Sequence, residues 1–450
     1  MQIILLSGGS GSRLWPLSND TRSKQFLKIL PVAGSDARES MVQRVVRQIK
    51  EADPQAHITI ATSLAQRDSV VSQLGKEVNI VTEPTRRGTF PAICLACEFL
   101  AKVKKCGPDE TVVVMPCDTF TNENFYQRLT NISRGVEENN FRLILMGVTP
   151  TYPSSKYGYI LPSEASAGLN QEGVRKVEKF VEKPSVEEAE RLISQGAFWN
   201  GGVFAFRLKY ITEISSQYVA GDSYEDYLGK YELFPKINFD YEIVEKESSL
   251  GMVAFEGYWK DLGTWNTLSD ELSVSQYGNV FTDGTSENTH IFNELNIPLL
   301  CLGTRDLIIA ASPDGIIVSE KSKSEAVKKF APRLKQRPMY EERRWGTYKV
   351  VDYVEFPDKF HALTKQLTLN PGCSISYQRH NCRDEVWTFI DGEGEIVIDG
   401  TRKPVRRGDV INIPKGQLHA LKAITPLTFI EVQHGSNLVE EDIERFPYEW

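Results

Sequence analysis

The sequence lacks any apolar run of the roughly 18 residues that a membrane-spanning helix requires. It also lacks basic residues ahead of its short N-terminal apolar segment, so a secretory signal peptide is not expected. Its seven cysteines are scattered and show none of the paired spacings typical of a disulfide framework. We therefore expect a cytoplasmic protein that has no membrane partner.

The chain has no excess of positive charge. It carries 52 lysines and arginines against 60 acidic residues, a formal net charge of −8, with the two signs interspersed. This balance argues against nucleic acid as the main partner, because surfaces that bind nucleic acid are strongly basic. With 41% hydrophobic and 25% charged residues over 450 positions, the composition is that of a globular protein of several domains.

Two well-known phosphate-binding motifs are also absent. The pattern GxxxxGK[ST] does not occur, and a dinucleotide-binding loop would need a third glycine where Leu14 stands. A different glycine loop is present, because the apolar run Ile3–Leu6 leads into Gly8, Gly9 and Gly11. Glycines allow backbone N–H groups to approach phosphates closely. Arg13 and Lys24 follow this loop, and two cations beside it suit a triphosphate.

From residue 1 to about 265, apolar runs typical of strands alternate with amphipathic segments typical of helices. The expected strands include 57–62, 78–83, 111–116 and 142–148, and segment 41–52 is an expected helix. Cys94 and Cys97 fall in an apolar helical stretch without a second cysteine pair, so we expect them in the core rather than on zinc. The alternation predicts an α/β domain with a doubly wound, mixed and mostly parallel sheet, whose ligands bind at the carboxyl ends of strands.

The rest of the chain is rich in short β runs. Residues 266–335 have such runs separated by turns, with no long helix before EAVKKF, and are expected to form a β-rich bridging segment. Residues 336–450 contain repeated short strands between Gly, Pro, Asn and Asp turns, which favours a small β-barrel or jelly roll. We thus expect three regions, with boundaries near residues 265 and 335.

Two aspartates are placed where a metal site would need them. Asp118 follows the apolar run VVVMPC at the expected carboxyl end of a strand, and Asp261 lies in GYWKDLGTW, where Gly263 indicates a turn. Carboxylates that meet across a pocket are suitable Mg²⁺ ligands. The sequence therefore predicts Mg²⁺ held by Asp118 and Asp261.

Several longer motifs carry a resemblance to a known family. The opening GGSGSRLWPLS with KQFL is similar to that of sugar-1-phosphate nucleotidyltransferases, and the form with Trp15 is similar to the mannose-1-phosphate guanylyltransferases. The segments MPCD, FVEKP at 180–184, GYI at 158–160, WNGG at 199–202 and WKDLGTW resemble further family motifs. The resemblance covers essentially the whole chain. Its nearest architecture is that of the type II bifunctional phosphomannose isomerase/guanylyltransferases.

The resemblance implies a set of functional residues. Catalytic roles fall on Arg13, Lys24, Asp118, Lys183 and Asp261. Nucleotide binding falls on Leu6, Gly8, Gly9, Gly11, Arg13, Lys24, Glu83, Arg87 and Thr89. Sugar-phosphate binding falls on Gly158, Glu182, Lys183 and Asn200. Because Lys183 precedes a proline, we expect extended backbone that aims its side chain.

The expected reaction is transfer of a nucleotidyl group from GTP to mannose 1-phosphate, which gives GDP-mannose and pyrophosphate. The base-binding segment of the family, EPxxRNTAPA, is altered here at Gly88 and Phe90. A related enzyme with another base or another sugar therefore stays open, as does a catalytically silent regulatory homologue. The intact catalytic residues argue against the silent homologue. GTP and a sugar 1-phosphate are the expected small-molecule partners, and a homo-oligomer is expected.

The C-terminal region resembles a cupin. The segments GCSISYQRHNCRDEVWTFIDG from Gly372 and GDVINIPKGQLHALKA from Gly408 are similar to the two cupin motifs. The resemblance implies a divalent metal, Zn²⁺ or another, on His380, Cys382, Glu385 and His419, with Cys382 in place of a histidine. The isomerase pattern has arginine after the last histidine, where this chain has Ala420. From these two changes we expect that isomerisation of mannose 6-phosphate is lost or nearly lost, and a bifunctional enzyme is the alternative.

Overall fold

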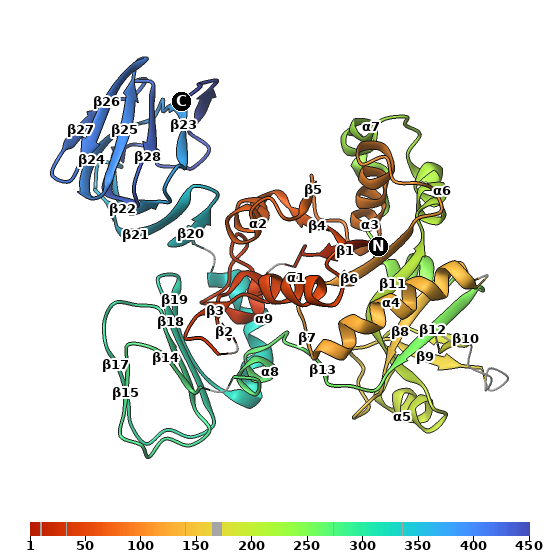
Figure 1. The fold of residues 1–450 in the computed structure, drawn as a ribbon. Helices are drawn as coiled ribbons and strands as arrows, with labels where there is room; N and C mark the ends of the chain where they lie inside the picture. The colour runs from red at the N-terminus through yellow and green to blue at the C-terminus, as the bar shows by residue number, and fades with distance from the viewer. Residues whose placement is uncertain (10, 33, 140, 164–172, 273, 335) are drawn as a thin grey trace. The chain divides into compact units, whose positions relative to one another are not determined.

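The computed structural model describes residues 1–9, 11–32, 34–139, 141–163, 173–272, 274–334 and 336–450. The chain forms two compact units, shown in Figure 1. The first comprises Met1–Ser10 with Ser23–Leu272, and the second comprises Gly11–Arg22 with Ser273–Trp450. The short segment Gly11–Arg22 is thus flanked in sequence by the first unit but makes its contacts in the second. Within the described part of the chain, no helix combines the length and the apolar character needed to cross a membrane.

The first unit is built on a nine-stranded sheet in the order β5-β4-β1-β6-β11-β8-β12-β10-β9. Its strands are β1 (Gln2–Leu6), β4 (His57–Ser63), β5 (Asn79–Glu83), β6 (Thr111–Pro116), β8 (Leu143–Val148), β9 (Tyr159–Pro162), β10 (Val174–Val181), β11 (Phe198–Arg207) and β12 (Leu250–Phe255). Strands β5, β4, β1 and β6 are parallel, and β11 runs antiparallel to β6 and β8. The predicted mixed α/β sheet and its expected strands are confirmed, but antiparallel neighbours are as common as parallel ones, so the sheet is not mostly parallel.

The first unit contains the helices α1 (Met41–Ala52), α2 (Arg67–Leu74), α3 (Thr89–Glu98), α4 (Glu123–Glu138), α5 (Val186–Ser194), α6 (Leu208–Tyr218), α7 (Tyr224–Gly229) and α8 (Trp265–Ser269), with shorter turns η2 (Lys24–Phe26), η3 (Leu64–Gln66), η4 (Phe99–Val103), η6 (Tyr231–Leu233) and η7 (Asp240–Val244). Among these helices, α1 and α4 cover one face of the sheet and α3 and α6 cover the other. The predicted helix 41–52 is confirmed as α1. It begins at a capping box, in which the Ser40 hydroxyl accepts from the Gln43 N–H and the Gln43 side chain accepts from the Ser40 N–H.

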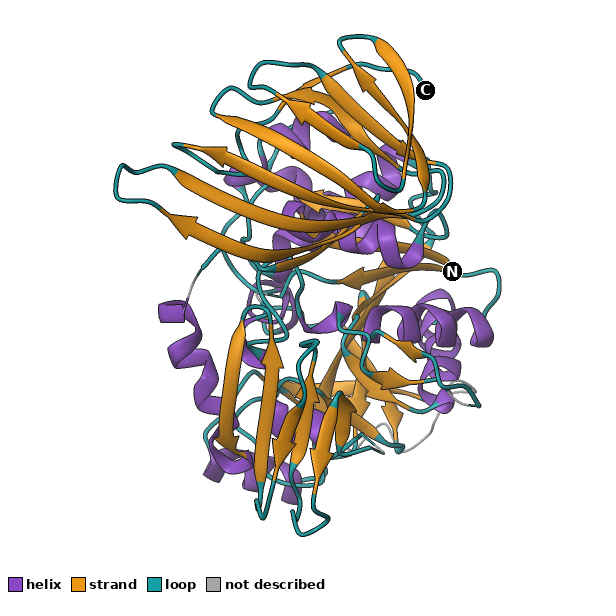
Figure 2. Cartoon of the chain, turned by 90° about the vertical axis from the view of Figure 1, so that its left-hand side faces the viewer, coloured by secondary structure: helices purple, strands orange, loops and turns teal. Residues whose placement is uncertain are grey.

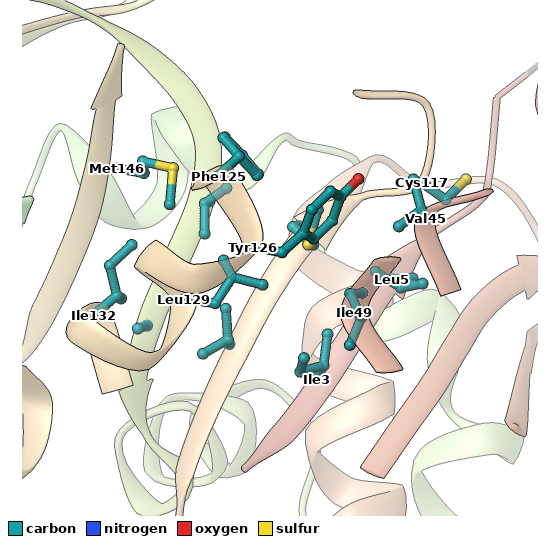
Figure 3. Packing of buried hydrophobic residues seen from close by; sticks show 14 of the residues in the cluster. Ile3, Leu5, Val45, Ile49, Cys117, Phe125, Tyr126, Leu129, Ile132 and Met146 are labelled. Atoms are coloured by element: carbon teal, nitrogen blue, oxygen red, sulfur yellow. The ribbon is translucent and has the colours of Figure 1, made fainter. Parts of the chain in front are cut away.

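Successive residues of the central strands enter two different cores. Ile3 and Leu5 of β1 pack with α1 and α4, as Figure 3 shows, whereas Ile4 packs on the other face with α3 and α6. Strand side chains alternate between faces, so burial on both sides requires the continuous apolar runs seen in the sequence. Cys94 and Cys97 are completely buried in the second core, which confirms their predicted structural role.

Two small ladders complete the first unit. Strands β2 (Leu30–Pro31) and β3 (Arg38–Glu39) pair with each other, and β7 (Thr119–Thr121) pairs with β13 (Trp259–Asp261). The second of these ladders places Asp261 opposite Thr119. It therefore brings the end of β6 and the WKDLG motif together.

The second unit starts with a β-rich bridge. It comprises β14 (Gln276–Gly278), β15 (Val280–Thr282), β16 (His290–Asn293), β17 (Leu299–Cys301), β18 (Leu307–Ser312) and β19 (Gly315–Glu320), followed by η8 (Lys321–Ala326), α9 (Val327–Phe330) and η9 (Ala331–Leu334). Strands β14, β16 and β18 pair in parallel, and β18 and β19 form an antiparallel hairpin. The short helix η1 (Ser12–Leu14) of the N-terminal segment lies against α9.

The C-terminal part of the second unit is a double-sheet barrel, formed by the strands near the C label in Figure 2. Its sheets have the orders β20-β21-β22-β29-β24-β27 and β26-β25-β28-β23-β30. The strands are β20 (Tyr340–Arg343), β21 (Gly346–Glu355), β22 (His361–Leu369), β23 (Ser374–Arg379), β24 (Arg383–Asp391), β25 (Glu393–Ile398), β26 (Thr401–Arg406), β27 (Val410–Ile413), β28 (His419–Ala423), β29 (Leu427–Gly435) and β30 (Glu444–Phe446). Trp387, Phe389 and Phe429 are buried at its centre. The predicted cupin-like barrel is confirmed.

Candidate functional site

The glycine loop begins where β1 ends, and two buried glutamines hold it. Gln25 donates to the carbonyl oxygen of Ser7 at 3.0 Å, and Gln66 donates to the carbonyl oxygen of Gly9 at 2.8 Å. Leu6 closes the strand by accepting from the Cys117 N–H at 3.2 Å. Sequence reasoning missed both glutamines as loop supports, because their partners are backbone carbonyls that no side-chain motif reveals.

Glu83 lies directly against the loop. A side-chain carbon at Gly8 would lie 3.2 Å from Glu83 Oε1, so glycine gives the carboxyl group room. The hydroxyl of Tyr231 donates to Glu83 Oε2 at 2.7 Å, and burial raises the pKa of Glu83 to about 7. The structure thus brings the predicted nucleotide residues Gly8 and Glu83 together and adds Tyr231.

The structure accounts for Gly88 and Phe90, the two residues of the base-binding segment that depart from the family pattern. Gly88 has φ +95° and approaches the Ile237 carbonyl so closely that a side-chain carbon would lie 2.5 Å from the oxygen. Phe90 is completely buried in the core. Arg87 Nε donates to the Phe234 carbonyl at 2.9 Å, and the Thr89 hydroxyl accepts from the Phe239 N–H at 2.8 Å. The segment is therefore anchored by backbone contacts with residues 234–239.

Lys24 joins the two predicted metal-binding aspartates. Its Nζ atom lies 2.6 Å from Asp118 Oδ2 and 3.2 Å from Asp261 Oδ1. Asp118 immediately precedes β7 and Asp261 ends β13, so the pairing of these strands brings the carboxylates together. Burial opposes the charge of Lys24, but the two carboxylates outweigh it and raise the pKa of Lys24 above its ordinary value.

The aspartates stay accessible to a ligand. Their side chains are 28% and 38% exposed, against 15% for Lys24. Two carboxylates that converge on one cation supply the oxygen ligands that Mg²⁺ prefers. The donor set of Asp118 and Asp261 therefore fits this metal.

A second group of predicted residues gathers around Glu182. Lys183 Nζ lies 2.5 Å from Glu182 Oε1, and a side-chain carbon at Gly158 would lie 2.5 Å from Glu182 Oε2. Asn200 donates its side-chain N–H to Asp240 Oδ1 at 2.8 Å, and its backbone N–H donates to the Gly158 carbonyl at 2.7 Å. The structure thus brings the predicted sugar-phosphate residues together.

Asp240 belongs to this group although sequence reasoning missed it. Burial raises the pKa of Asp240 to about 6, and the Glu182 carboxylate adds to the shift. No motif marks Asp240, because it lies in the short helix η7, far from FVEKP in sequence. Its contact with Asn200 identifies it, and that contact is tertiary.

The backbone at Lys183 differs from the extended conformation expected before a proline. Lys183 has φ +46°, in the left-handed region that few residues other than glycine adopt. In this conformation the Lys183 ammonium forms an ion pair with the Glu182 carboxylate and lies 5.7 Å from the ring centroid of Tyr241. The expectation of extended backbone was wrong, because side-chain contacts prevail over the local steric preference.

Three aromatic residues tie the sugar motifs to the metal motif. Tyr157 immediately precedes the GYI segment, and Trp199 and Trp259 belong to the WNGG and WKDLG segments, respectively. Their ring centroids lie 5.0 Å apart for Tyr157 with Trp199 and 5.4 Å apart for Tyr157 with Trp259. These contacts place the three motifs side by side in the first unit.

Arg13 and Gly11 have a different setting. Both lie in the segment Gly11–Arg22 that belongs to the second unit, and Arg13 is exposed in η1. Gly11 has φ +60°, a conformation that suits glycine.

The barrel contains a buried cluster of His380, Glu385 and His419. One ligand atom from each lies within 4.8 Å of the others. The Nδ1 atoms of His380 and His419 lie 2.5 Å from the Asp442 carbonyl and 3.0 Å from that of Gln417, so each must donate there. Each Nε2 atom is then an unprotonated lone pair directed at Glu385, at 3.3 Å and 3.7 Å.

The protonation states of the two histidines and of Glu385 also suit metal ligands. Burial lowers the pKa of both His380 and His419, which favours neutral imidazoles. Burial works against the Glu385 carboxylate, but the charged Arg383, which donates to it, holds the pKa of Glu385 below its ordinary value. Among the residues described, His419 Nε2 has no hydrogen-bond partner. Two neutral imidazoles and a carboxylate fit a divalent metal.

Cys382 does not join this cluster. Its side chain is exposed, whereas Arg383 faces inward and donates to Glu385 Oε1 at 2.8 Å. A candidate for the fourth ligand is Gln378, whose carboxamide lies 3.4 Å from His380 Nε2. Sequence reasoning missed Gln378 because it took His380 as the first ligand of the motif, and Gln378 lies two residues before it.

Ala420 also lies outside the cluster. It follows His419 on β28, so its side chain points to the opposite face of that strand. Neither Cys382 nor Ala420 therefore alters the face that carries His380, Glu385 and His419. The expectation that Cys382 replaces a metal ligand is therefore wrong. The expectation from Ala420 concerned the substrate's phosphate, which the resemblance assigns to an arginine at this position, and the metal cluster does not test it.

The fold and these two sites define a nucleotide-binding α/β domain joined to a cupin-like barrel. Residues 2–275 match the family model described as nucleotidyl transferase, and residues 334–448 match the one described as mannose-6-phosphate isomerase C-terminal. Because the first match spans more than half of the sequence, the chain belongs to the nucleotidyl transferase family.

Relatives match over nearly the full length. The chain is 28% identical to a mannose-1-phosphate guanylyltransferase of Escherichia coli strain K12, with 98% of this chain and 97% of that protein covered. It is 30% identical to the xanthan biosynthesis protein XanB of Xanthomonas campestris pv. campestris strain B100, with the same coverage. A crystal structure of a mannose-1-phosphate geranyltransferase from Thermus thermophilus matches with TM-score 0.60 and 25% identity, over 74% of this chain and 99% of that one.

Proposed function

We propose that this protein transfers a guanylyl group from GTP to mannose 1-phosphate, which gives GDP-mannose and pyrophosphate. The observation that carries the proposal is the convergence of Asp118 and Asp261 on Lys24. Nucleotidyl transfer needs little more from a protein than positioning and compensation of charge, and these three groups supply both. The match to the nucleotidyl transferase model and the relatives' names support the choice of reaction.

The proposed step is an in-line displacement. A phosphate oxygen of mannose 1-phosphate attacks the α-phosphorus of GTP and forms a new P–O bond. The bond between the α-phosphorus and the bridging oxygen to the β-phosphorus breaks, and pyrophosphate leaves with that electron pair. Lys24 stabilises the triphosphate, and Arg13 has the same role by its place in the loop.

Mg²⁺ would be held by Asp118 and Asp261. When bound, it would supply positive charge to the reacting phosphates. The nucleotide side of the site comprises Leu6, Gly8, Gly9, Gly11, Glu83, Arg87 and Thr89. In this proposal, Gln25 and Gln66 keep the loop backbone in place.

The sugar 1-phosphate binds to the second group of residues, the one around Glu182. Lys183 is the cation for its phosphate, and Glu182, Asn200 and the space at Gly158 accommodate sugar hydroxyls. The Glu182 side chain is only 5% exposed while that of Lys183 is 44% exposed, so the lysine can reach a ligand that enters from solvent. Asp240 orients Asn200.

We further propose that the protein acts in the cytoplasm as a homo-oligomer and has no nucleic acid or membrane partner. The net charge of −8 supports the absence of a polyanionic partner. Light scattering on the purified chain tests the oligomeric state, and a single-chain mass would contradict it.

The decisive experiment is a screen of four nucleoside triphosphates against several sugar 1-phosphates, scored by pyrophosphate release with Mg²⁺. Turnover with GTP and mannose 1-phosphate is expected. Turnover with another pair alone would retain the reaction class and change the ligands. No turnover with any pair would favour a regulatory homologue.

A second function is favoured by the barrel cluster. We propose that the barrel holds a divalent metal, Zn²⁺ or another, through His380, Glu385 and His419 with Gln378 beside them. The metal would supply charge stabilisation next to the sugar carbonyl during isomerisation of mannose 6-phosphate. The unpartnered Nε2 of His419, judged within the described residues, supports this assignment.

A further inference from the structure

The turn of the β18–β19 hairpin contacts the N-terminal segment Gly11–Arg22. The Ser312 hydroxyl donates to the Pro16 carbonyl at 2.7 Å. Gly315 has φ +146°, and a side-chain carbon there would lie 2.6 Å from the indole of Trp15. An ordinary hairpin turn needs neither contact, so this SPDG turn has a role beyond reversing the chain.

Asp314 of the same turn connects three elements. Its Oδ2 accepts from the Asn19 side chain at 2.7 Å, and its Oδ1 accepts from the Met339 N–H at 2.6 Å. Asn19 itself caps a tight turn by accepting from the N–H groups of Thr21 and Arg22 at 3.0 Å and 2.8 Å. Asp314 therefore fixes a segment that is already folded locally.

Arg22 provides the second anchor. Its guanidinium forms a two-bond ion pair with Glu294, at 2.8 Å and 2.9 Å, and lies 5.0 Å from the ring centroid of Tyr340. Both charged side chains are largely buried, at 13% and 15% exposure. Such planar, bidentate pairs fix orientation as well as distance.

The ion pair also separates the tasks of the two arginines in this segment. The charge of Arg22 is compensated by Glu294, whereas the side chain of Arg13 is exposed to solvent. Glu294 is itself fixed, because its N–H donates to the Ala311 carbonyl at 2.8 Å. Arg22 therefore anchors the segment, and Arg13 stays accessible to a ligand.

We propose that Glu294 and Asp314 are positioning residues for nucleotide binding, which hold the segment Gly11–Arg22, and with it Arg13, in the conformation that receives the triphosphate. This inference rests on the proposed function. It assigns the bridge a role in the transferase reaction, although none of its residues belongs to the motifs of that reaction.

The test uses the full-length protein and two variants, Glu294→Ala and Asp314→Ala. The matched control is Glu287→Ala, which removes an ion pair of the same bridge whose partners are exposed, with Glu287 and Arg305 at 64% and 70%. Hydrogen exchange of peptides covering residues 11–22 is measured by mass spectrometry, together with KM for each substrate.

Both variants are expected to exchange faster over residues 11–22 and to raise the KM for GTP on the order of 10-fold, because misplaced binding groups lose affinity. The KM for the sugar phosphate is expected to change by no more than about two-fold, since Lys183 binds it elsewhere. The control is expected to match wild type. Glu294→Asp, which keeps the charge, is expected to restore part of the GTP affinity.

Three outcomes would overturn the proposal. Unchanged exchange over residues 11–22 would show that the contacts do not hold the segment. Faster exchange with an unchanged KM for GTP would show that the segment does not position nucleotide. An equal rise in both KM values would indicate a general structural defect. Should Glu294→Ala fail to fold, Glu294→Gln takes its place. A wild-type protein that uses no nucleotide at all would refute the proposed function itself.

Discussion

Lys24 Nζ lies 2.6 Å from Asp118 Oδ2, although the two residues belong to different motifs that lie far apart in sequence. This lysine compensates one of the two negative charges of Asp118 and Asp261. A triphosphate and a metal ion that enter the site would exchange partners with this group of three, because phosphate competes for the lysine and the metal competes for the carboxylates.

Loss of either carboxylate should severely reduce turnover. Asp118→Asn and Asp261→Asn are each expected to lower kcat on the order of 100-fold or more, because each removes a metal ligand that acts on transition-state charge. Asp270→Asn is the control, since Asp270 pairs with Lys260 on the same segment outside the site. Steady-state pyrophosphate release measures the effect. Normal turnover in either site variant, with the fold intact, would contradict its role.

The two lysines should affect different substrates. Lys183→Met is expected to raise mainly the KM for the sugar phosphate, whereas Lys24→Met and Arg13→Met are expected to impair the use of GTP. The reason is placement, since Lys183 contacts Glu182 in the sugar group and Lys24 contacts the aspartates. Lys179→Met, at an exposed lysine of the neighbouring strand β10, is the control. If Lys183→Met weakened GTP alone, the two ends of the pocket would be reversed.

Much of the first unit was predictable from sequence because its sheet is buried on both faces. Continuous apolar runs such as Ile3–Leu6 and 111–116 have few alternatives to a central strand. Residues quoted in motifs, such as Asp118 and Lys24, lie where the carboxyl ends of strands meet. The partners that hold them could not be predicted. Gln25 lies in the quoted KQFL segment, but its contact with the Ser7 carbonyl is tertiary, and Gln66 and Asp240 lie outside the quoted motifs.

The barrel shows why residue spacing alone can mislead. Strand alternation places Arg383 and Glu385 on the same face and sends Cys382 outward. Counting along the chain assigned Cys382 to the metal and left out Gln378, which reaches the cluster from β23. The register of two paired strands decides this question, and a single sequence does not contain that register.

A buried acid in the barrel should make its stability depend on pH. Burial raises the pKa of Glu431 to about 8, and the Glu385 carboxylate adds to the shift. In the unfolded chain Glu431 ionises near its ordinary value of 4.5, so the folded state is increasingly disfavoured as pH rises from about 4.5 to about 8. The substitution Glu431→Gln removes the ionisable group and with it this decrease in folding stability at higher pH.

Calorimetry of the barrel transition measures the difference between wild type and Glu431→Gln. The variant should gain on the order of 2 kcal/mol relative to wild type between about pH 6 and pH 8. Glu393→Gln, at an exposed position of the same barrel, should show no such gain. A pH-independent difference for Glu431→Gln would show that its carboxyl group ionises normally.

The barrel should convert fructose 6-phosphate to mannose 6-phosphate when a divalent metal is supplied. Isomerisation moves a proton between C1 and C2 of the sugar and needs charge stabilisation beside the carbonyl oxygen, and the neutral imidazoles of His380 and His419 with the Glu385 carboxylate provide the ligands for it. The assay adds Zn²⁺, Mn²⁺ or Co²⁺ to metal-free protein and follows mannose 6-phosphate directly.

Turnover on the order of the typical 10 s⁻¹ is expected, and His419→Ala should abolish it. The same variant should keep full guanylyltransferase activity, because the two sites use separate residues, and Asp118→Asn should show the reverse pattern. Cys382→Ser should leave isomerisation unchanged, since the Cys382 side chain is exposed and outside the cluster. Loss of isomerisation in Cys382→Ser would instead indicate that the Cys382 thiol is a metal ligand. Metal binding at the His380 cluster without turnover would show that the barrel retains the ion and has lost the reaction.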